Sequence, residues 1–142
     1  MGALTKEKDV RVLMPTRVEG EKFVTEAEGE FARDGDVFCL AYTECSNGEV
    51  TRNGLQISRE KMLLHRDGAV CGEMLFDPGT VTRASYRTMG MEMSFAVRTV
   101  RYDVFFDEKL MVIDLRYSLQ ENENAVPTRY ALKIEISDAP CK

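Results

Sequence analysis

The sequence contains no apolar run that approaches the roughly 18 to 20 residues needed to cross a bilayer. Its first residues, MGALTKEKDVRVLMPTRVEGEK, also lack the apolar stretch of a signal peptide, because charges interrupt them every few positions. An excess of positive charge is missing as well: 19 Lys and Arg stand against 24 Asp and Glu, and the two signs are interleaved. Since phosphate binding needs clustered Lys and Arg, these absences predict a cytosolic protein with neither a membrane nor a nucleic acid as partner.

The sequence has four cysteines but no CxxC pair. Without an export signal, Cys39, Cys45, Cys71 and Cys141 are expected to be reduced thiols. Cys39 and Cys45, if they share one strand, lie roughly 20 Å apart, too far to hold one metal ion. We therefore predict that the cysteines are small buried or half-buried hydrophobes, and we expect no metal and no cofactor.

Histidine occurs once, as His65. No GxSxG, HExxH, P-loop or GxGxxG motif accompanies it. General acid or base work by His65 would also need an orienting carboxylate, which only folding could supply. The sequence thus predicts a protein that is not an enzyme, with His65 as a surface or hydrogen-bonded strand residue.

A regular succession of short β-rich segments fills the chain instead. Its 142 residues suffice for one domain, and hydrophobic residues make up 44% of them, enough for one core. Turn signals such as Asp34-Gly35 and Asp67-Gly68 recur about every ten residues. We predict strands at 8–14, 23–31, 37–45, 50–57, 61–66, 69–76, 80–88, 91–106, 111–119 and 130–136. The result is one all-β domain over 1–142, with its core in about 8–137, folded as an antiparallel β-barrel because closure removes exposed strand edges.

Residues 23–31 show the period of a strand with one solvated side. Apolar and small residues stand at odd positions, and Glu26, Glu28 and Glu30 stand at even ones. The three carboxylates, about 6 to 7 Å apart, could bind a hard cation. A charge row on a strand is far more often a solvated face, and we predict that here.

The segment 91–106 contains a break in its alternation. Apolar residues occupy odd positions up to Val97 and even positions from Val100 onward. A strand cannot switch faces without an extra residue, so we predict a bulge near Arg98-Thr99 that helps this long strand turn a barrel corner.

The ordered set of turns and strands resembles a known family. The run from Leu64 to Leu119 carries the segments that match, in this order: Arg66-Asp67-Gly68-Ala69-Val70, Met74-Leu75-Phe76, Tyr86-Arg87-Thr88, Val97-Arg98-Thr99 and Leu115-Arg116-Tyr117-Ser118-Leu119. Two earlier segments are similar in register: Glu28-Gly29-Glu30-Phe31 and Leu40-Ala41-Tyr42-Thr43-Glu44. With these motifs the chain resembles, over about residues 8–137, the YwiB-like family of bacterial domains of unknown function.

That resemblance implies a lipocalin-like, or calycin, up-and-down barrel of about eight to ten strands, in a small cytosolic bacterial protein with no established activity. The chain departs from the family before its long strand. Relatives tend to carry Thr-Pro-aromatic-Gly there, whereas this chain has Thr88-Met89-Gly90-Met91, with the glycine shifted.

Five polar residues stand among strands that carry core side chains, and they form the candidate ligand-binding set: Tyr42, Glu44, Arg66, Tyr86 and Arg98. A barrel of about eight strands has room either for its own side chains or for one small ligand, whose orientation a few buried polar groups then fix. Glu44 and Arg66 could equally form a structural ion pair that closes one barrel end. We favour that account, because buried charges are tolerated only when they are paired.

Arginines in neighbouring strands form a second cluster. Arg83 and Arg87, near Arg98 and Arg101, could make a cationic patch for an acidic ligand or partner. Cross-strand ion pairs with Glu73 or Glu92 are the account we favour.

Two functions remain open. The first is a non-catalytic barrel that binds a small, partly apolar ligand, which predicts a cavity at one barrel mouth and binding that depends on Tyr42 and Tyr86. The second is a structural or protein-interaction module, with a homodimer as one form, whose barrel is filled by its own side chains. It predicts an exposed apolar patch beside Met89 and Met91; with Met93, these alternate Met residues favour packing or an adaptable pocket over a soft-metal site. An enzyme ranks below both, since it would need shifted pKa values around His65 or Glu44 in a cleft.

Overall fold

Strict alternation of inward and outward side chains shapes the strands of this protein. In β1, for example, Val10 and Val12 are buried while Arg11 between them is exposed. The computed structural model describes residues 8–46, 48–106 and 110–139. These residues form ten strands: β1 (Lys8–Val18), β2 (Glu21–Asp34), β3 (Val37–Ser46), β4 (Glu49–Ile57), β5 (Met62–Gly68), β6 (Val70–Phe76), β7 (Thr82–Thr88), β8 (Met91–Phe106), β9 (Leu110–Gln120) and β10 (Thr128–Asp138).

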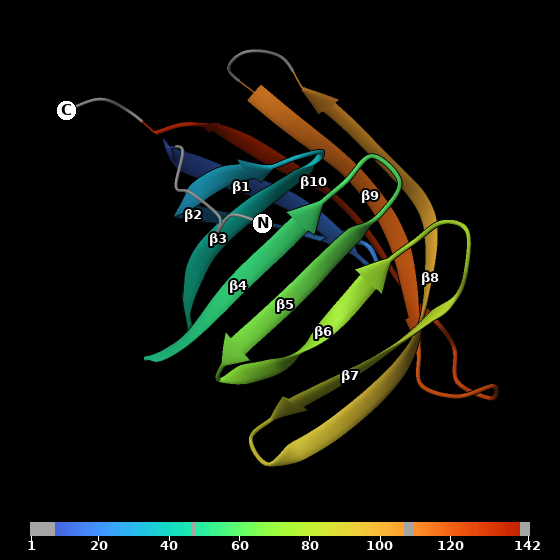
Figure 1. Cartoon of the computed structure of the whole chain (residues 1–142). Helices are drawn as coiled ribbons and strands as arrows, with labels where there is room; N and C mark the ends of the chain where they lie inside the picture. The colour runs from blue at the N-terminus through green and yellow to red at the C-terminus, as the bar shows by residue number, and fades with distance from the viewer. Residues whose placement is uncertain (1–7, 47, 107–109, 140–142) are drawn as a thin grey trace.

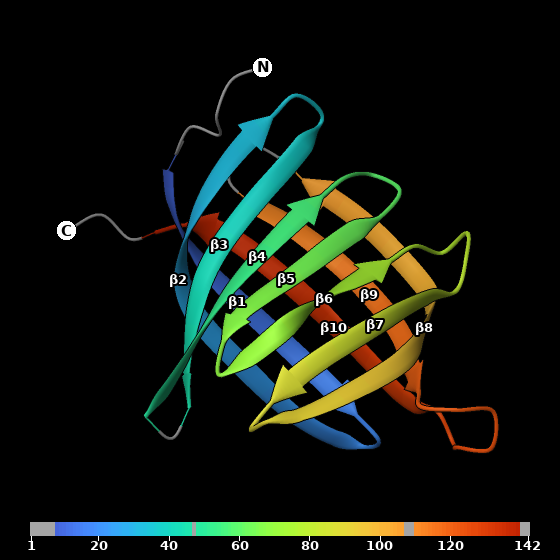
Figure 2. The ribbon, with the colours of Figure 1, turned by 60° about the horizontal axis from the view of Figure 1, so that its bottom comes forward.

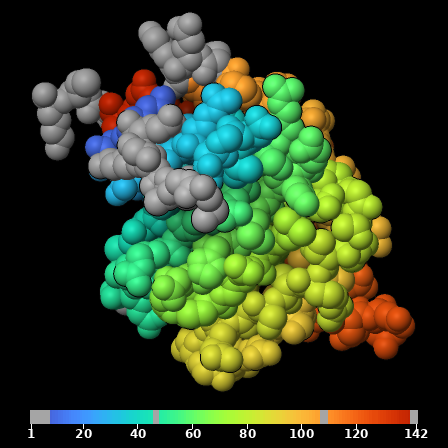
Figure 3. Space-filling view, in the orientation of Figure 1, coloured from blue at the N-terminus to red at the C-terminus, as the bar shows by residue number. Residues whose placement is uncertain are grey.

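Each strand pairs antiparallel with its neighbour in the chain, and β1 pairs with β10 to close the barrel (Figure 1). Strands β3 to β7 form the near wall in Figure 2, and β1, β10 and β9 form the far wall. Side chains of β3 to β7 cover the outside of the near wall (Figure 3). The prediction of an all-β, antiparallel up-and-down barrel is confirmed; the lipocalin-like label stays a prediction. No helix long and apolar enough to span a membrane occurs among the described residues.

The barrel interior is mostly apolar. Side chains that are almost completely buried come from all around the barrel: Val10, Val12, Leu40, Ile57, Met62, Val97, Ile113 and Leu115. This packing stabilises the closed sheet because apolar area leaves water on the inner face of every strand.

The predicted bulge in β8 is present one residue later than expected. Thr99 lies opposite Tyr117 and Arg101 lies opposite Arg116, so Val100 is the extra residue. Val100 is 70% exposed, which corrects the expectation that it faces the core. Phe23, close to the turn between β1 and β2, is also exposed. It does not join the inner face predicted for 23–31.

Strand β1 is longer than predicted, because it continues through Pro15. Pro15 lies opposite Val24 of β2, while the pairing of β1 with β10 is interrupted between Leu13 and Thr16. Proline lacks the N–H that a ladder hydrogen bond needs, so one side of the strand loses its pairing there and the strand still runs on.

Candidate functional site

Three neighbouring strands change from apolar to polar on their inner face at the same level of the barrel. On β4, inward Ile57 and Leu55 give way to Asn53, and on β5, inward Met62 and Leu64 give way to Arg66. Tyr42 on β3 lies directly opposite Asn53. This level is one inward step below the turns that join β5 to β6 and β7 to β8, and two inward steps below the turn that joins β3 to β4.

The pairing register places one residue of β6 and one of β7 at the same level of the barrel. Arg66 lies opposite Gly72 of β6, and Gly72 lies opposite Tyr86 of β7. The inner face therefore presents one continuous row, which we call the polar row: Tyr42, Asn53, Arg66, Gly72 and Tyr86. Glu44 follows two residues after Tyr42 on the same face of β3.

Hydrogen bonds link the charged end of the polar row. Arg66 Nε donates to Asn53 Oδ1 at 2.9 Å, and Asn53 Nδ2 donates to Glu44 Oε1 at 2.6 Å. Arg66 Nη2 and Glu44 Oε1 are 3.4 Å apart. The predicted ion pair between Glu44 and Arg66 is thus confirmed. Their side chains are 36% and 24% exposed, so this pair faces solvent at the barrel end.

Tyr86 stands at the other end of the polar row, and the hydrogen bonding of its hydroxyl group is incomplete. Its ring is a neighbour of Arg66, whose guanidinium carbon is 6.0 Å from the ring centroid. The Tyr86 hydroxyl is buried and has no hydrogen-bond partner among the described residues, and the same holds for Thr99 Oγ1. Native proteins satisfy nearly all buried polar groups, so each of these two oxygens is an exception that calls for a further polar group beside it.

Other tyrosines of the interior are deeply buried too. The Tyr42 hydroxyl donates to Met14 Sδ at 3.8 Å, and the ring of Tyr117 stacks on Tyr130 with centroids 4.8 Å apart. Burial raises the pKa of Tyr42, and Glu44 raises it further. Burial also raises the pKa of Tyr117, with a further increase from Tyr130.

The raised pKa values limit what the polar row can do chemically. Burial raises the pKa of Tyr86, and Arg66 opposes that increase. Phenols whose pKa lies above the ordinary value near 10 stay protonated at neutral pH, so they donate hydrogen bonds and do not accept protons. At neutral pH the polar row therefore offers hydrogen-bond donors and no phenolate.

The structure brings together four of the five predicted ligand-binding residues: Tyr42, Glu44, Arg66 and Tyr86. Arg98 is not with them, because it follows buried Val97 on β8 and faces outward. Asn53 and Tyr117 were missed. Asn53, Leu55 and Ile57 stand at alternate positions of β4, so their side chains share the inner face. This alternation could have identified Asn53 from the sequence.

His65 lies on the outside of the barrel. Its Nδ1 is 3.1 Å from Glu73 Oε2, and both side chains are 60% exposed. Folding thus supplies the carboxylate that a catalytic histidine would need, in an exposed position on the surface. Glu73 was expected to pair with an arginine and pairs with His65 instead.

One of the four arginines of the predicted cationic cluster has the predicted partner. Arg87 and Glu92 are 3.6 Å apart across β7 and β8. Arg101 Nε is 2.7 Å from Asp103 and 3.3 Å from Asp114. Only Arg83 and Arg98 of the predicted cationic cluster have no ion pair within the described residues.

Cys39 and Cys71 are half-buried free thiols, as predicted, whereas Cys45 is exposed, which corrects the expectation for that residue. Cys141 lies outside the described residues. Burial raises the pKa of the Cys39 thiol, and Asp34 raises it further, which is the reverse of what activates a nucleophile.

Acidic residues do not gather into a metal site in the described part of the chain. Glu26, Glu28 and Glu30 are exposed along β2, and Glu26 pairs with Arg11. The predicted solvated face is confirmed.

Comparison with known proteins agrees with this geometry. The crystal structure of the ywiB protein from Bacillus subtilis has a TM-score of 0.80 to this barrel at 20% identity, over 97% of this chain and 96% of that chain. At that identity the likeness shows the fold alone. No curated protein matches the sequence. The model of a family described as a domain of unknown function (DUF1934) matches residues 12–134, which confirms the YwiB-like resemblance, and the chain belongs to that family.

Proposed function

We propose that this protein is a non-catalytic cytosolic barrel that binds one small, partly apolar molecule beside Tyr86. The observation that carries the proposal is the buried Tyr86 hydroxyl, which lacks a partner among the described residues. A ligand atom would complete its hydrogen bonding, as buried hydroxyls require. The partly exposed Arg66–Glu44 pair marks the side from which the ligand enters.

The neighbours of that hydroxyl define the ligand's chemistry. Arg66 is already paired with Glu44, so the site adds little net charge and suits a neutral molecule. Tyr86 offers a protonated phenol, which calls for a hydrogen-bond acceptor on the ligand. Met93, opposite Tyr86 on β8, offers an adaptable apolar contact for the remainder.

A structural or protein-interaction module is the second candidate, and the tip of the β7–β8 hairpin favours it. Met89 and Met91 are 89% and 65% exposed there. Exposed Met residues suit an adaptable contact with a partner or with a second copy of the chain. In that case the interior needs no ligand.

Native mass spectrometry of gently purified protein tests the first proposal against the second. We expect an excess mass that disappears on denaturation, and a two- to tenfold lower occupancy in Tyr86→Phe, roughly the effect of one hydrogen bond. Tyr102→Phe is the matched control, because the Tyr102 hydroxyl is satisfied by the Ser58 carbonyl at 2.5 Å. It should keep the bound mass. A bare sequence mass, together with a Tyr86→Phe variant more stable than wild type, would show that the barrel is filled and the oxygen simply unsatisfied.

A further inference from the structure

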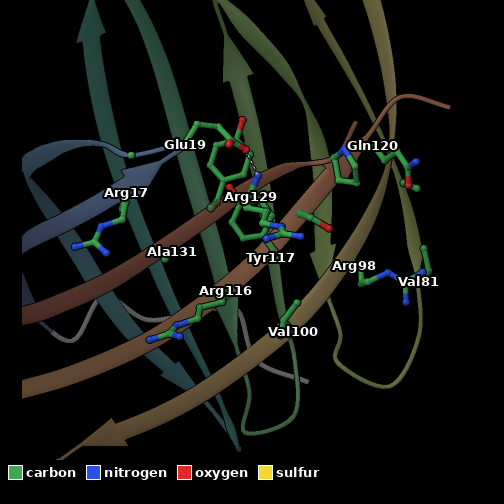
Figure 4. A pocket seen from close by; sticks show the side chains of 15 residues that line it. Arg17, Glu19, Val81, Arg98, Val100, Arg116, Tyr117, Gln120, Arg129 and Ala131 are labelled. Carbon is green, nitrogen blue, oxygen red and sulfur yellow. Dashed lines mark hydrogen bonds between the residues drawn. The ribbon is translucent and has the colours of Figure 1, made fainter. Parts of the chain in front are cut away.

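A groove of about 700 Å³ runs over the outer face of β8, β9, β10 and β1 (Figure 4). Small side chains, Ala96, Ser118 and Ala131, are among the residues that line it. Arginines from the four strands stand around these small residues: Arg17, Arg98, Arg116 and Arg129. A groove of this size is within the range that holds one small molecule.

The strand register explains how these arginines come together. On one level, Ser118 lies between Arg98 on β8 and Arg129 on β10. On the next level, Ala131 lies between Arg116 on β9 and Arg17 on β1. Each pair of long cationic side chains therefore flanks a short one, which leaves room for a ligand between them.

The charge of the groove differs from that of the remaining surface. Several arginines elsewhere have acidic partners, as in Arg52–Asp67 and Arg87–Glu92. None of the four groove arginines has an ion-pair partner in the described parts of the chain, and Lys22 lies opposite Arg17 to add one more positive charge. This concentration of positive charge contrasts with the net charge of −5 of the whole chain.

Acidic groups near the groove offset only part of this charge, because Glu19 supplies one carboxylate against the four arginines that line it. Glu19 lines the groove, and its Oε1 accepts the backbone N–H of Arg129 at 2.9 Å. Asp103 and Asp114 pair with the adjacent Arg101. Four exposed guanidinium groups that line one groove repel each other, and a multiply charged anion would relieve that repulsion.

We propose that this groove binds a small organic molecule that carries two or more phosphate groups, with nucleoside polyphosphates as the class that fits best. Guanidinium forks match phosphate oxygens two at a time, and several phosphates can engage several arginines together. Val81, Val100 and Pro127 also line the groove and give an apolar surface for the nucleoside part. Val100 stands there because the β8 bulge turns it outward.

The arginines of this groove are separate from the polar row, although Tyr117 of the barrel interior also lines the groove. These arginines point outward, whereas Arg66 and Tyr86 point into the barrel, and the sheet separates the two sets. The groove can therefore bind its ligand whether or not the interior holds one.

Isothermal titration calorimetry of the full chain with ATP, inorganic tripolyphosphate and adenosine tests the proposal. We expect ATP to bind best, tripolyphosphate to bind more weakly and adenosine not to bind, with affinities that fall as salt is added. Arg116→Gln and Arg129→Gln should each weaken ATP binding about tenfold or more, as expected for charge-assisted hydrogen bonds. Arg116→Lys should give an intermediate loss, because lysine keeps the charge without the fork.

Arg59→Gln is the matched control. Arg59 is an exposed arginine in the turn between β4 and β5 that lies outside the groove, and its replacement should leave ATP binding unchanged. Circular dichroism of each variant verifies that these exposed substitutions leave the fold intact. The proposal is overturned by any of three results: no binding of ATP and tripolyphosphate to wild type, equal losses in the control, or tight binding of a single-stranded RNA oligonucleotide without binding of ATP.

Discussion

Gly72 makes room for the aromatic ring that lies over it in the barrel interior. A Cβ atom at this position would stand 2.1 Å from Tyr86 Cδ1 and 2.4 Å from the Ser85 carbonyl oxygen. Its φ of +153° is also in a region that only glycine adopts readily. The Tyr86 ring thus reaches across to Arg66 because the residue between them has no side chain.

Replacing Gly72 with alanine should lower the free energy of unfolding by about 3 kcal/mol, from ring displacement and backbone strain together. Urea denaturation measures this. Gly54→Ala is the control, since a Cβ there meets nothing within 4 Å, and it should change stability by less than about 0.5 kcal/mol. Combining Gly72→Ala with Tyr86→Ala should recover the part of the loss that comes from the ring. An additive double variant would mean that the ring is not the obstacle.

The sequence contains enough to predict some site residues and too little for others. Tyr42 and Glu44 share one parity on a strand with a clear alternation, so both could be placed on the inner face. The place of Asn53 beside Tyr42 depends on the register between β3 and β4, which no local pattern specifies. Arg98 was grouped with the interior set although its parity after Val97 already points it outward. The arginine groove could not be foreseen, because three of its arginines meet through the register of β8, β9 and β10, and Arg17 joins them only when β1 closes on β10.

At the scale of the element, the β7–β8 hairpin shows a turn under backbone strain. Thr88 and Met91 are paired, so the loop consists of Met89 and Gly90 alone. Their φ angles are +52° and +75°, as in a type I′ turn. Gly90 adopts this conformation freely, whereas Met89 is forced into it by the twist of the two strands.

Met89→Asn should stabilise the protein by about 0.5 to 1 kcal/mol, because Asn-Gly is the preferred pair for this turn. Met89 is 89% exposed, so its loss sacrifices no packing. Thermal unfolding should show a rise of a few degrees in Tm. Met91→Asn, in the adjoining strand, serves as control and should not stabilise. A lower Tm for Met89→Asn would show that the methionine side chain contributes a contact of its own.

Strands with uninterrupted alternation could be predicted almost to the residue, and the exceptions have local causes. Pro15 looked like the end of β1, yet proline is tolerated because only one of the two neighbouring ladders loses a hydrogen bond there. The switch of parity in β8 correctly indicated a bulge. Its position could not be resolved from parity, since either Val100 or a neighbour could be the extra residue.

At the scale of the whole molecule, barrel closure gathers tyrosines from opposite walls. Tyr42 and Tyr86 belong to β3 and β7, while Tyr117 and Tyr130 belong to β9 and β10. Tyr117 is sensitive to the charge on all three of the others, and burial is the largest cause of its raised pKa. The folded barrel therefore holds these phenols protonated at a pH at which the unfolded chain releases their protons.

This difference predicts loss of stability in alkali. A group whose pKa is higher in the folded state contributes stability that is complete below its unfolded pKa near 10 and that is lost as the pH rises above that value. Each such phenol steepens the decline by up to roughly 1.4 kcal/mol per pH unit. Tyr117→Phe removes one of them, so its free energy of unfolding should fall less steeply above pH 10 than that of wild type. Urea denaturation at neutral pH and at successive alkaline values measures both slopes.

Tyr130→Phe should flatten the slope less, because Tyr130 is only half-buried and its pKa is raised less. Parallel slopes for wild type and Tyr117→Phe would mean that Tyr117 ionises as readily in the folded barrel as in the unfolded chain, and that the interior is more open to water than its packing indicates.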